Sequence, residues 1–200
     1  MAVQMAESDA AHDIAHIQRV VANAKRLAQE ETADLAVVIP AAWLHDCVTV
    51  PKNSPLRNQA SRLAAEKAGE YLTEAGYPAE HISSIQHAVE AHSFSAGIPP
   101  RTLEAKVVQD ADRLDAIGAI GIARCFATGG SFGTNIHHPE TPFGGERPLD
   151  DKTYSVDHFY TKLFKLIEMM NTDAGRQEAE RRNAYMRDFL AQLGSEISWS

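Results

Sequence analysis

A histidine and an aspartate, His45 and Asp46, stand side by side directly after the apolar run IPAAWL. That run predicts that the end of its helix enters the core, where a carboxylate is costly unless a cation or hydrogen bonds meet it. A metal ion is the simplest such partner. Imidazole nitrogen and carboxylate oxygen suit manganese, iron or magnesium, and the lack of a CxxC motif argues against structural zinc. Adjacent helical side chains diverge by about 100°, so other helices must complete the site.

The chain as a whole is acidic: 19 Lys and Arg stand against 27 Asp and Glu, giving a net charge of −8. This charge repels a phosphodiester backbone and makes duplex nucleic acid a poor partner, although a few converging cations can still hold a small anion.

With 200 residues, 44% of them hydrophobic, we expect one domain over residues 1–200. No long apolar span or signal-type N-terminus occurs, which predicts no membrane partner and a cytoplasmic location.

Apolar residues recur at the three-and-four spacing of helices, and strand alternation is nowhere sustained, so the sequence predicts an all-α fold. Pro40 is expected to kink its helix or to stand in the first turn. The Gly- and Pro-rich stretch 129–152 predicts a long irregular loop, a kind that is often functional. Helices are expected over 8–31, 34–47, 60–72, 82–92, 103–127, 155–170 and 173–193.

Three segments, in this order, resemble the signature segments of the HD superfamily of metal-dependent phosphohydrolases. They are His16 in AHIQRV, the His-Asp pair in LHDC and the run VVQDADRLDAIGA. Two further stretches, ASRLAAEKAGEYL and HFYTKLFKLIEMMNT, are similar to small stand-alone bacterial HD-domain hydrolases. The resemblance implies an HD-type helical bundle whose four ligands hold one divalent ion, Mn²⁺ or Mg²⁺ first, with Fe²⁺ or Ni²⁺ as alternatives.

The resemblance also implies the ligand set His16, His45, Asp46 and Asp112. Two alternatives stay open. His12, in a second His-Asp pair, competes with His16, although His12 lies one turn nearer the helix end. Asp110 competes with Asp112, whose Ala-Asp-x-Leu context is the better match to the family pattern.

Such a site predicts hydrolysis at phosphorus, because one cation lowers the pKa of water and neutralises phosphate oxygens. Asp46 is expected to orient the attacking hydroxide, and His92 to contact the substrate or act as general acid. His137 and His138, in the long loop, are expected to form a mobile surface pair rather than a metal site. Four residues are expected to bind substrate: Lys52, Asn53, Arg57 and Asp115.

The activity that the resemblance implies is cleavage of a phosphate ester or phosphoanhydride in a small phosphorylated metabolite, with a nucleotide as the leading class. A nucleotidase or a nucleotide pyrophosphohydrolase fits this description. Cys47 to Val50 stand where alarmone-hydrolysing relatives carry an acidic pair, so that activity is less expected. The rival hypothesis is a noncatalytic HD module that binds metal or nucleotide and signals. A homo-oligomer is compatible with either hypothesis.

Overall fold

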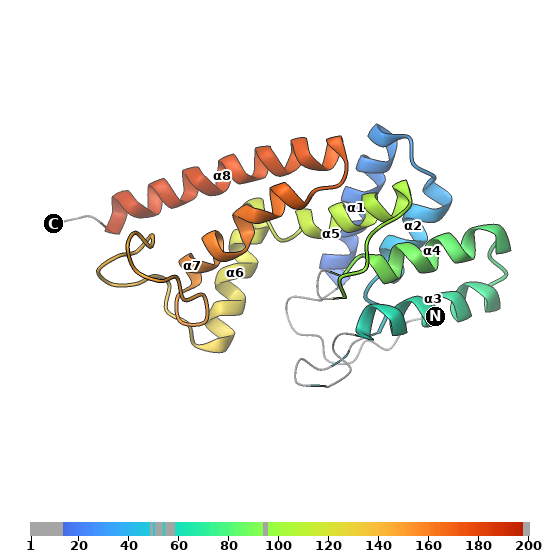
Figure 1. Cartoon of the computed structure of the whole chain (residues 1–200), viewed down its shortest axis with the longest axis horizontal. Coiled ribbons are helices and arrows are strands. Elements are labelled where there is room, and N and C mark those ends of the chain that lie inside the picture. The colour runs from blue at the N-terminus through green and yellow to red at the C-terminus, as the bar shows by residue number, and fades with distance from the viewer. Residues whose placement is uncertain (1–13, 49, 51–53, 55–58, 94–95, 198–200) are drawn as a thin grey trace. The chain divides into compact units, whose positions relative to one another are not determined.

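The computed structural model describes residues 14–48, 50, 54, 59–93 and 96–197 (Figure 1). Regular secondary structure in these residues is helical, with one isolated bridge between Asn135 and Tyr154, which confirms the all-α fold. The elements are α1 (Ile14–Glu31), α2 (Leu35–Leu44), α3 (Ala60–Glu74), α4 (Ala79–Ala91), α5 (Leu103–Leu114), α6 (Gly118–Phe132), α7 (Ser155–Thr161), the 3-10 helix η2 (Leu163–Met169) and α8 (Asp173–Ile197). None of these helices is both long and apolar enough to cross a membrane.

The chain divides into two compact units. The first holds the described residues up to Asp112 together with Asn171–Gly175, and the second holds Arg113–Met170 and the residues from Arg176 onward. The single domain over residues 1–200 remains a prediction.

The first unit is built around α2, which packs against α1 and α4, while α3 and α4 lie side by side (Figure 1). The carboxylate of Asp34 caps α2 by accepting a 2.8 Å hydrogen bond from the N–H of Ala36. Pro40 lies in the middle of α2 rather than in its first turn. Because most of α2 is apolar, the helix carries His45 into the core, but Asp46 is only half-buried and Cys47 is exposed, so the carboxylate expected in the core lies at its edge.

The helix expected over 103–127 is two helices, α5 and α6. The break falls before Gly118, which has a φ of 75°, and a Cβ there would approach the side chain of Arg182 to 3.0 Å. The glycines at 129 and 130 do not end α6. It runs to Phe132 and stops at Gly133, another left-handed glycine with a φ of 72°. The segment 155–170 likewise divides, into α7 and η2.

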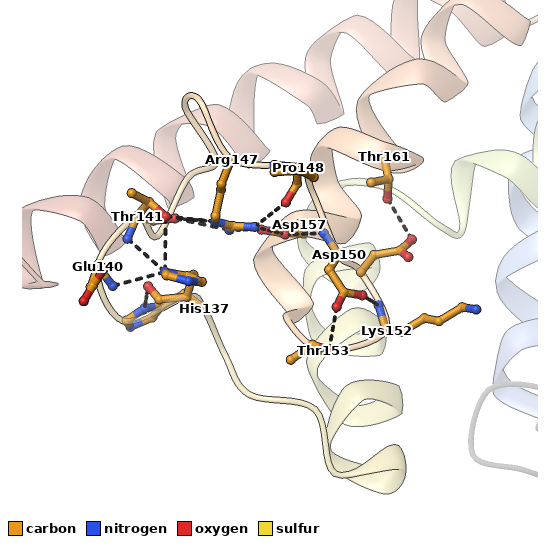
Figure 2. A network of polar contacts seen from close by, with 12 residues as sticks. His137, Glu140, Thr141, Arg147, Pro148, Asp150, Lys152, Thr153, Asp157 and Thr161 are labelled. Atoms are coloured by element: carbon orange, nitrogen blue, oxygen red, sulfur yellow. Dashed lines mark hydrogen bonds and ion pairs between the residues drawn. The ribbon is translucent and has the colours of Figure 1, made fainter.

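The loop between α6 and α7 is irregular, as expected, but polar contacts order it (Figure 2). Both terminal nitrogens of Arg147 donate to the buried carboxylate of Asp157, each at 2.6 Å, and the N–H of Asp150 donates to it at 2.7 Å. His138 accepts at Nδ1 from the N–H of Thr141 at 3.1 Å, and its ring packs on Tyr154. His138 is therefore half-buried and takes part in the contacts of the loop, while the mobility expected for the pair stays a prediction.

Candidate metal centre

The four predicted metal ligands lie in the first unit, on or directly after α1, α2 and α5. His16 lies in the first turn of α1 and shares its buried face with Val20, one turn later. His45 follows the last residue of α2 and is fully buried, and Asp46 comes next. Asp112 lies in the last turn of α5. The side chains of Asp46 and Asp112 are 30% and 29% exposed, so the carboxylate side of the cluster is open to solvent.

The potential ligand atoms converge. The Nε2 atoms of His16 and His45 are 3.3 Å apart. Oδ1 of Asp112 lies 3.5 Å from Nε2 of His16 and 3.9 Å from that of His45. Oδ2 of Asp46 lies 4.0 Å from Nε2 of His16 and 3.6 Å from that of His45. Atoms that ligate one ion at about 2.1 Å lie roughly 3 to 4 Å from one another. The separations of each carboxylate oxygen from the two nitrogens therefore fit ligands of a single divalent cation, and His16, His45 and Asp112 form a group that could hold one.

Hydrogen bonding prepares His45 as a ligand. Its Nδ1 lies 2.8 Å from the carbonyl oxygen of Ala42, which can only accept, so Nδ1 carries the proton. Burial lowers the pKa of His45, and the charge of His92 lowers it further. A neutral ring protonated at Nδ1 directs the lone pair of Nε2 toward the other ligand atoms, which is the form that binds a metal.

His92 joins the same cluster from the end of α4. Its Nδ1 lies 2.6 Å from the carbonyl oxygen of Val89, its ring packs edge-on against His45 at 4.9 Å, and its Nε2 lies 3.5 Å from Oδ1 of Asp46. Burial opposes its charged form, but the hydrogen bond with Asp46 and the charges of Asp112 and Asp46 outweigh burial and raise the pKa of His92. His45, Asp46 and His92 form a second group that could hold a metal.

The sequence predicted a substrate contact or a general acid role for His92, and the structure places this residue beside Asp46, in a group that could hold a metal. The positions of His45 and His92 in the sequence could have indicated that the two residues lie in one site. His45 and His92 each follow the last residue of a helix, and each ring is oriented by the carbonyl three residues before it. Two histidines at equivalent helix ends could have suggested that both belong to one site.

The two aspartates of α5 have different surroundings. Asp110 is fully buried, and its carboxylate accepts from the backbone N–H groups and side chains of Asn171 and Thr172 at 2.8 to 3.0 Å. Asp112, two residues later, faces the histidines. A carboxylate saturated by protein donors is a poor ligand, so this geometry favours Asp112 over Asp110.

Lys52, Asn53 and Arg57 lie outside the described residues, as does His12. Asp115 is buried in the second unit, where the guanidinium of Arg124 donates to its carboxylate and, at 3.2 Å, to its carbonyl oxygen. A contact of Asp115 with substrate stays a prediction.

Comparison with known proteins identifies relatives along nearly the whole chain. The profile of the HD domain family matches residues 13–117. The chain is 34% identical over 197 residues to the uncharacterized protein YpgQ of Bacillus subtilis (strain 168), an alignment that covers 96% of this chain and 88% of YpgQ.

Solved structures are also similar to this chain. The crystal structure of Bacillus subtilis YpgQ in complex with ADP is similar with a TM-score of 0.74 and 35% identity, covering 94% of this chain and 88% of that one. An HD-superfamily hydrolase from Bacillus thuringiensis matches with a TM-score of 0.74 and 36% identity, covering 96% and 90%. The profile match includes the segments that carry all four predicted ligands, and the chain belongs to the HD domain family.

Proposed function

We propose that this protein is a metal-dependent phosphohydrolase that acts on a small phosphorylated metabolite, with nucleotides as the leading substrate class. The observation that carries the proposal is the convergence of two imidazole nitrogens and two carboxylate oxygens: the nitrogens are 3.3 Å apart, and each oxygen lies 3.5 to 4.0 Å from both nitrogens. HD domains bind divalent metals, and this donor set suits manganese or magnesium, with iron or nickel as alternatives.

In this proposal His16, His45, Asp46 and Asp112 hold the cation. When bound, the cation supplies Lewis acidity, which lowers the pKa of water and neutralises phosphate oxygens. The partly exposed carboxylate of Asp46 orients the attacking water. The single-metal assignment is preferred, since one ion accounts for all four of these residues.

His92 is proposed as the group that holds a proton for the leaving group. Its Nε2 lies 3.5 Å from Asp46, and its Nδ1 is held by the carbonyl of Val89. A ring fixed in this way can present one N–H to an oxygen that leaves phosphorus, as general acid catalysis requires. Lys52, Asn53 and Arg57 are proposed to bind the phosphate oxygens that the cation does not reach.

The nucleotide preference is supported by a relative. YpgQ, at 35% identity, has been crystallised in complex with ADP. We infer that this chain also binds a nucleotide, and that a nucleoside di- or triphosphate is cleaved at an ester or anhydride bond.

The test is a panel of nucleoside mono-, di- and triphosphates, together with sugar phosphates and cyclic nucleotides, assayed with Mn²⁺, Mg²⁺ or Ni²⁺. Phosphate and pyrophosphate should be measured separately, because their ratio identifies the bond that is cleaved. We expect turnover of at least one nucleotide by the wild type and by His138→Ala, and none by His45→Ala. Turnover of non-nucleotide phosphates alone would overturn the nucleotide preference.

The second candidate is a noncatalytic HD module that binds a metal or a nucleotide. The ADP complex of YpgQ is compatible with this alternative, since binding does not require turnover. A fully metal-loaded protein that binds nucleotides but turns over none of the panel would establish it.

A further inference from the structure

The side chain of Gln109, on α5, is buried and bonds to two segments that are distant from each other in the sequence. Its Nε2 donates to the carbonyl oxygen of Ala91 at 2.7 Å. Ala91 is the last residue of α4, where a helix carbonyl has no partner within its own helix. Gln109 therefore supplies that partner, at the residue that directly precedes His92.

Asn171 holds the other end of the Gln109 amide. Its Nδ2 donates to Oε1 of Gln109 and to Oδ1 of Asp110, each at 2.8 Å. Backbone N–H groups donate to both oxygens of Asp110, so its carboxylate acts only as an acceptor and Asn171 must direct its NH₂ group there. Gln109 must then direct its oxygen to Asn171 and its NH₂ group to Ala91. Asp110 thus sets the direction of both amides.

The segment Asn171–Gly175 belongs to the first unit, although it lies outside residues 13–117, which match the HD profile. The N–H of Ala174 donates to Oε1 of Glu31 at 2.7 Å, which ties the segment to the end of α1. Gly175 permits the close approach to α5, because a Cβ there would lie 2.5 Å from Oδ2 of Asp110. The segment is therefore fixed to two helices that also carry predicted metal ligands.

The ring of His92 depends on the backbone at the end of α4. Its Nδ1 lies 2.6 Å from the carbonyl oxygen of Val89, and the ring packs edge-on against His45 at 4.9 Å. Ala91 is fully buried, so its carbonyl would lose a hydrogen bond without gaining water if Gln109 were absent. The bond from Gln109 therefore fixes the peptide that carries the His92 ring.

We propose that Gln109 is a positioning residue for His92, and that Asn171 positions Gln109 in turn. Through the carbonyl of Ala91, Gln109 keeps the imidazole of His92 in the orientation that presents its N–H to the leaving oxygen. The inference rests on the proposed function, in which His92 holds the proton for the leaving group. It adds to the site two residues that do not touch the substrate, one of them beyond the HD profile.

Gln109→Met tests the proposal, because methionine keeps the length of the side chain and removes both hydrogen bonds. Gln86→Met is the matched control, since Gln86 lies on α4 and also donates to a helix carbonyl, that of Ala65, at 3.1 Å. In the full-length protein loaded with diamagnetic Mg²⁺, NMR measures cross-relaxation between the ring protons of His45 and His92. We expect this signal to be lost in Gln109→Met and to keep its wild-type intensity in Gln86→Met.

Asn171→Leu is the second variant, and it keeps Gln109 in place. Leucine has the shape of asparagine but cannot donate to the Gln109 oxygen, while the backbone N–H of residue 171 can still donate to Asp110. We expect the His45–His92 signal to weaken in this variant too. Retention of the full signal would remove Asn171 from the proposal.

A leaving-group comparison separates proton donation from stability. The 4-nitrophenyl and phenyl esters of thymidine 5′-monophosphate carry the same nucleotide, but phenolate is the stronger base and needs a proton more. We expect kcat for the phenyl ester to fall about tenfold or more in Gln109→Met, because a misdirected catalytic group loses most of its effect. The kcat for the 4-nitrophenyl ester should fall less, and KM should stay close to wild type for both.

Equal losses of kcat on the two esters, or an unchanged His45–His92 signal in Gln109→Met, would overturn the proposal. The same changes in Gln86→Met would also overturn it, because they would follow from the loss of any buried glutamine bond. The nucleotide panel tests the proposed function separately. If the wild type turns over none of the panel, that function fails, while the ring signal still decides whether Gln109 positions His92.

Discussion

Two clusters of buried polar groups, one in each unit, differ in how their charges are matched. In the first unit, His16 and His45 lie 3.3 Å apart and meet Asp46 and Asp112 at separations of 3.5 to 4.0 Å. In the second unit, the carboxylate of Asp157 receives hydrogen bonds of 2.6 to 2.7 Å (Figure 2). The second cluster is closed by protein donors. The atoms of the first cluster have the spacing of ligands arranged around a shared ion. Burial of a polar group is common to both clusters, so it indicates a function only when the partners of that group are considered.

The largest expected effect is the loss of the first cluster's metal in His45→Ala. Changes to residues that merely support metal ligands cost about 10- to 100-fold in affinity, so removal of a ligand should cost at least about 100-fold. Metal content by mass spectrometry and turnover on the substrate panel are the measurements. His138→Ala, in the second unit, is the matched control and should keep its metal. Full metal content in His45→Ala would contradict the assignment.

Arg147→Ala should break the second cluster without touching the first. It leaves the carboxylate of Asp157 without its cation, so the free energy of unfolding should fall by more than in a variant at an exposed arginine. Urea denaturation measures the free energy of unfolding, and metal content should stay at the wild-type level. Arg181→Ala, at a side chain that is 75% exposed, should change stability by about 0.5 kcal/mol or less. A similar small effect of Arg147→Ala would show that the network does not stabilise the protein.

Metal addition should stabilise the wild type but not a variant that has lost a ligand. An ion at 100 times its dissociation constant stabilises a folded protein by about 2.7 kcal/mol, if it does not bind the unfolded chain. Thermal unfolding with Mn²⁺ and with EDTA compares the two states. Asp112→Ala should lose this difference, whereas Asp188→Ala, at an exposed position on α8, should keep it. An equal response of Asp112→Ala and wild type would remove Asp112 from the ligand set.

A smaller effect is expected from Thr172→Val, which removes a hydroxyl that donates to Asp110 at 2.8 Å and accepts from the N–H of Gly175 at 3.0 Å. Hydrogen bonds to charged groups contribute about 1.5 kcal/mol or more, so the free energy of unfolding, measured by urea denaturation, should fall by at least that amount. Thr153→Val, which removes an exposed hydroxyl bonded to Asp150, is the control and should have little effect. If Thr172→Val were as stable as its control, the turn at 171–172 would not anchor α5.

The last prediction concerns the stability of the protein in acid, and its effect at neutral pH is the smallest. Burial alone would raise the pKa of Asp157, but the hydrogen bonds from Arg147 and from the N–H of Asp150 outweigh it and lower the pKa. Stability from a depressed pKa is complete above the unfolded value of about 3.9 and is lost as pH falls through the folded value. Unfolding free energies should therefore show this loss only below about pH 4, and it should be reduced in Arg147→Ala. A loss that begins near pH 6 would point to other groups.

Much of the fold could be predicted from local pattern. The apolar spacing predicted α1, α3, α4 and α8 close to their observed positions, because a helix that buries one face needs residues at that spacing. The break between α5 and α6 could not be predicted in this way. It depends on Gly118 and on its approach to Arg182, a residue of α8 that is far along the chain.

The sequence by itself determined the helical class and the ordered segments that identify the HD domain family, since both are written in residue types and spacing. It left Asp110 and Asp112 as competing ligands because both stand in the same motif. Only the tertiary structure shows their different surroundings: donors at Asn171 and Thr172, about sixty residues away, occupy Asp110, while α1 and α2 bring His16 and His45 to Asp112. Periodicity decides which face of a helix is buried, but only packing decides which residues from other helices meet it there.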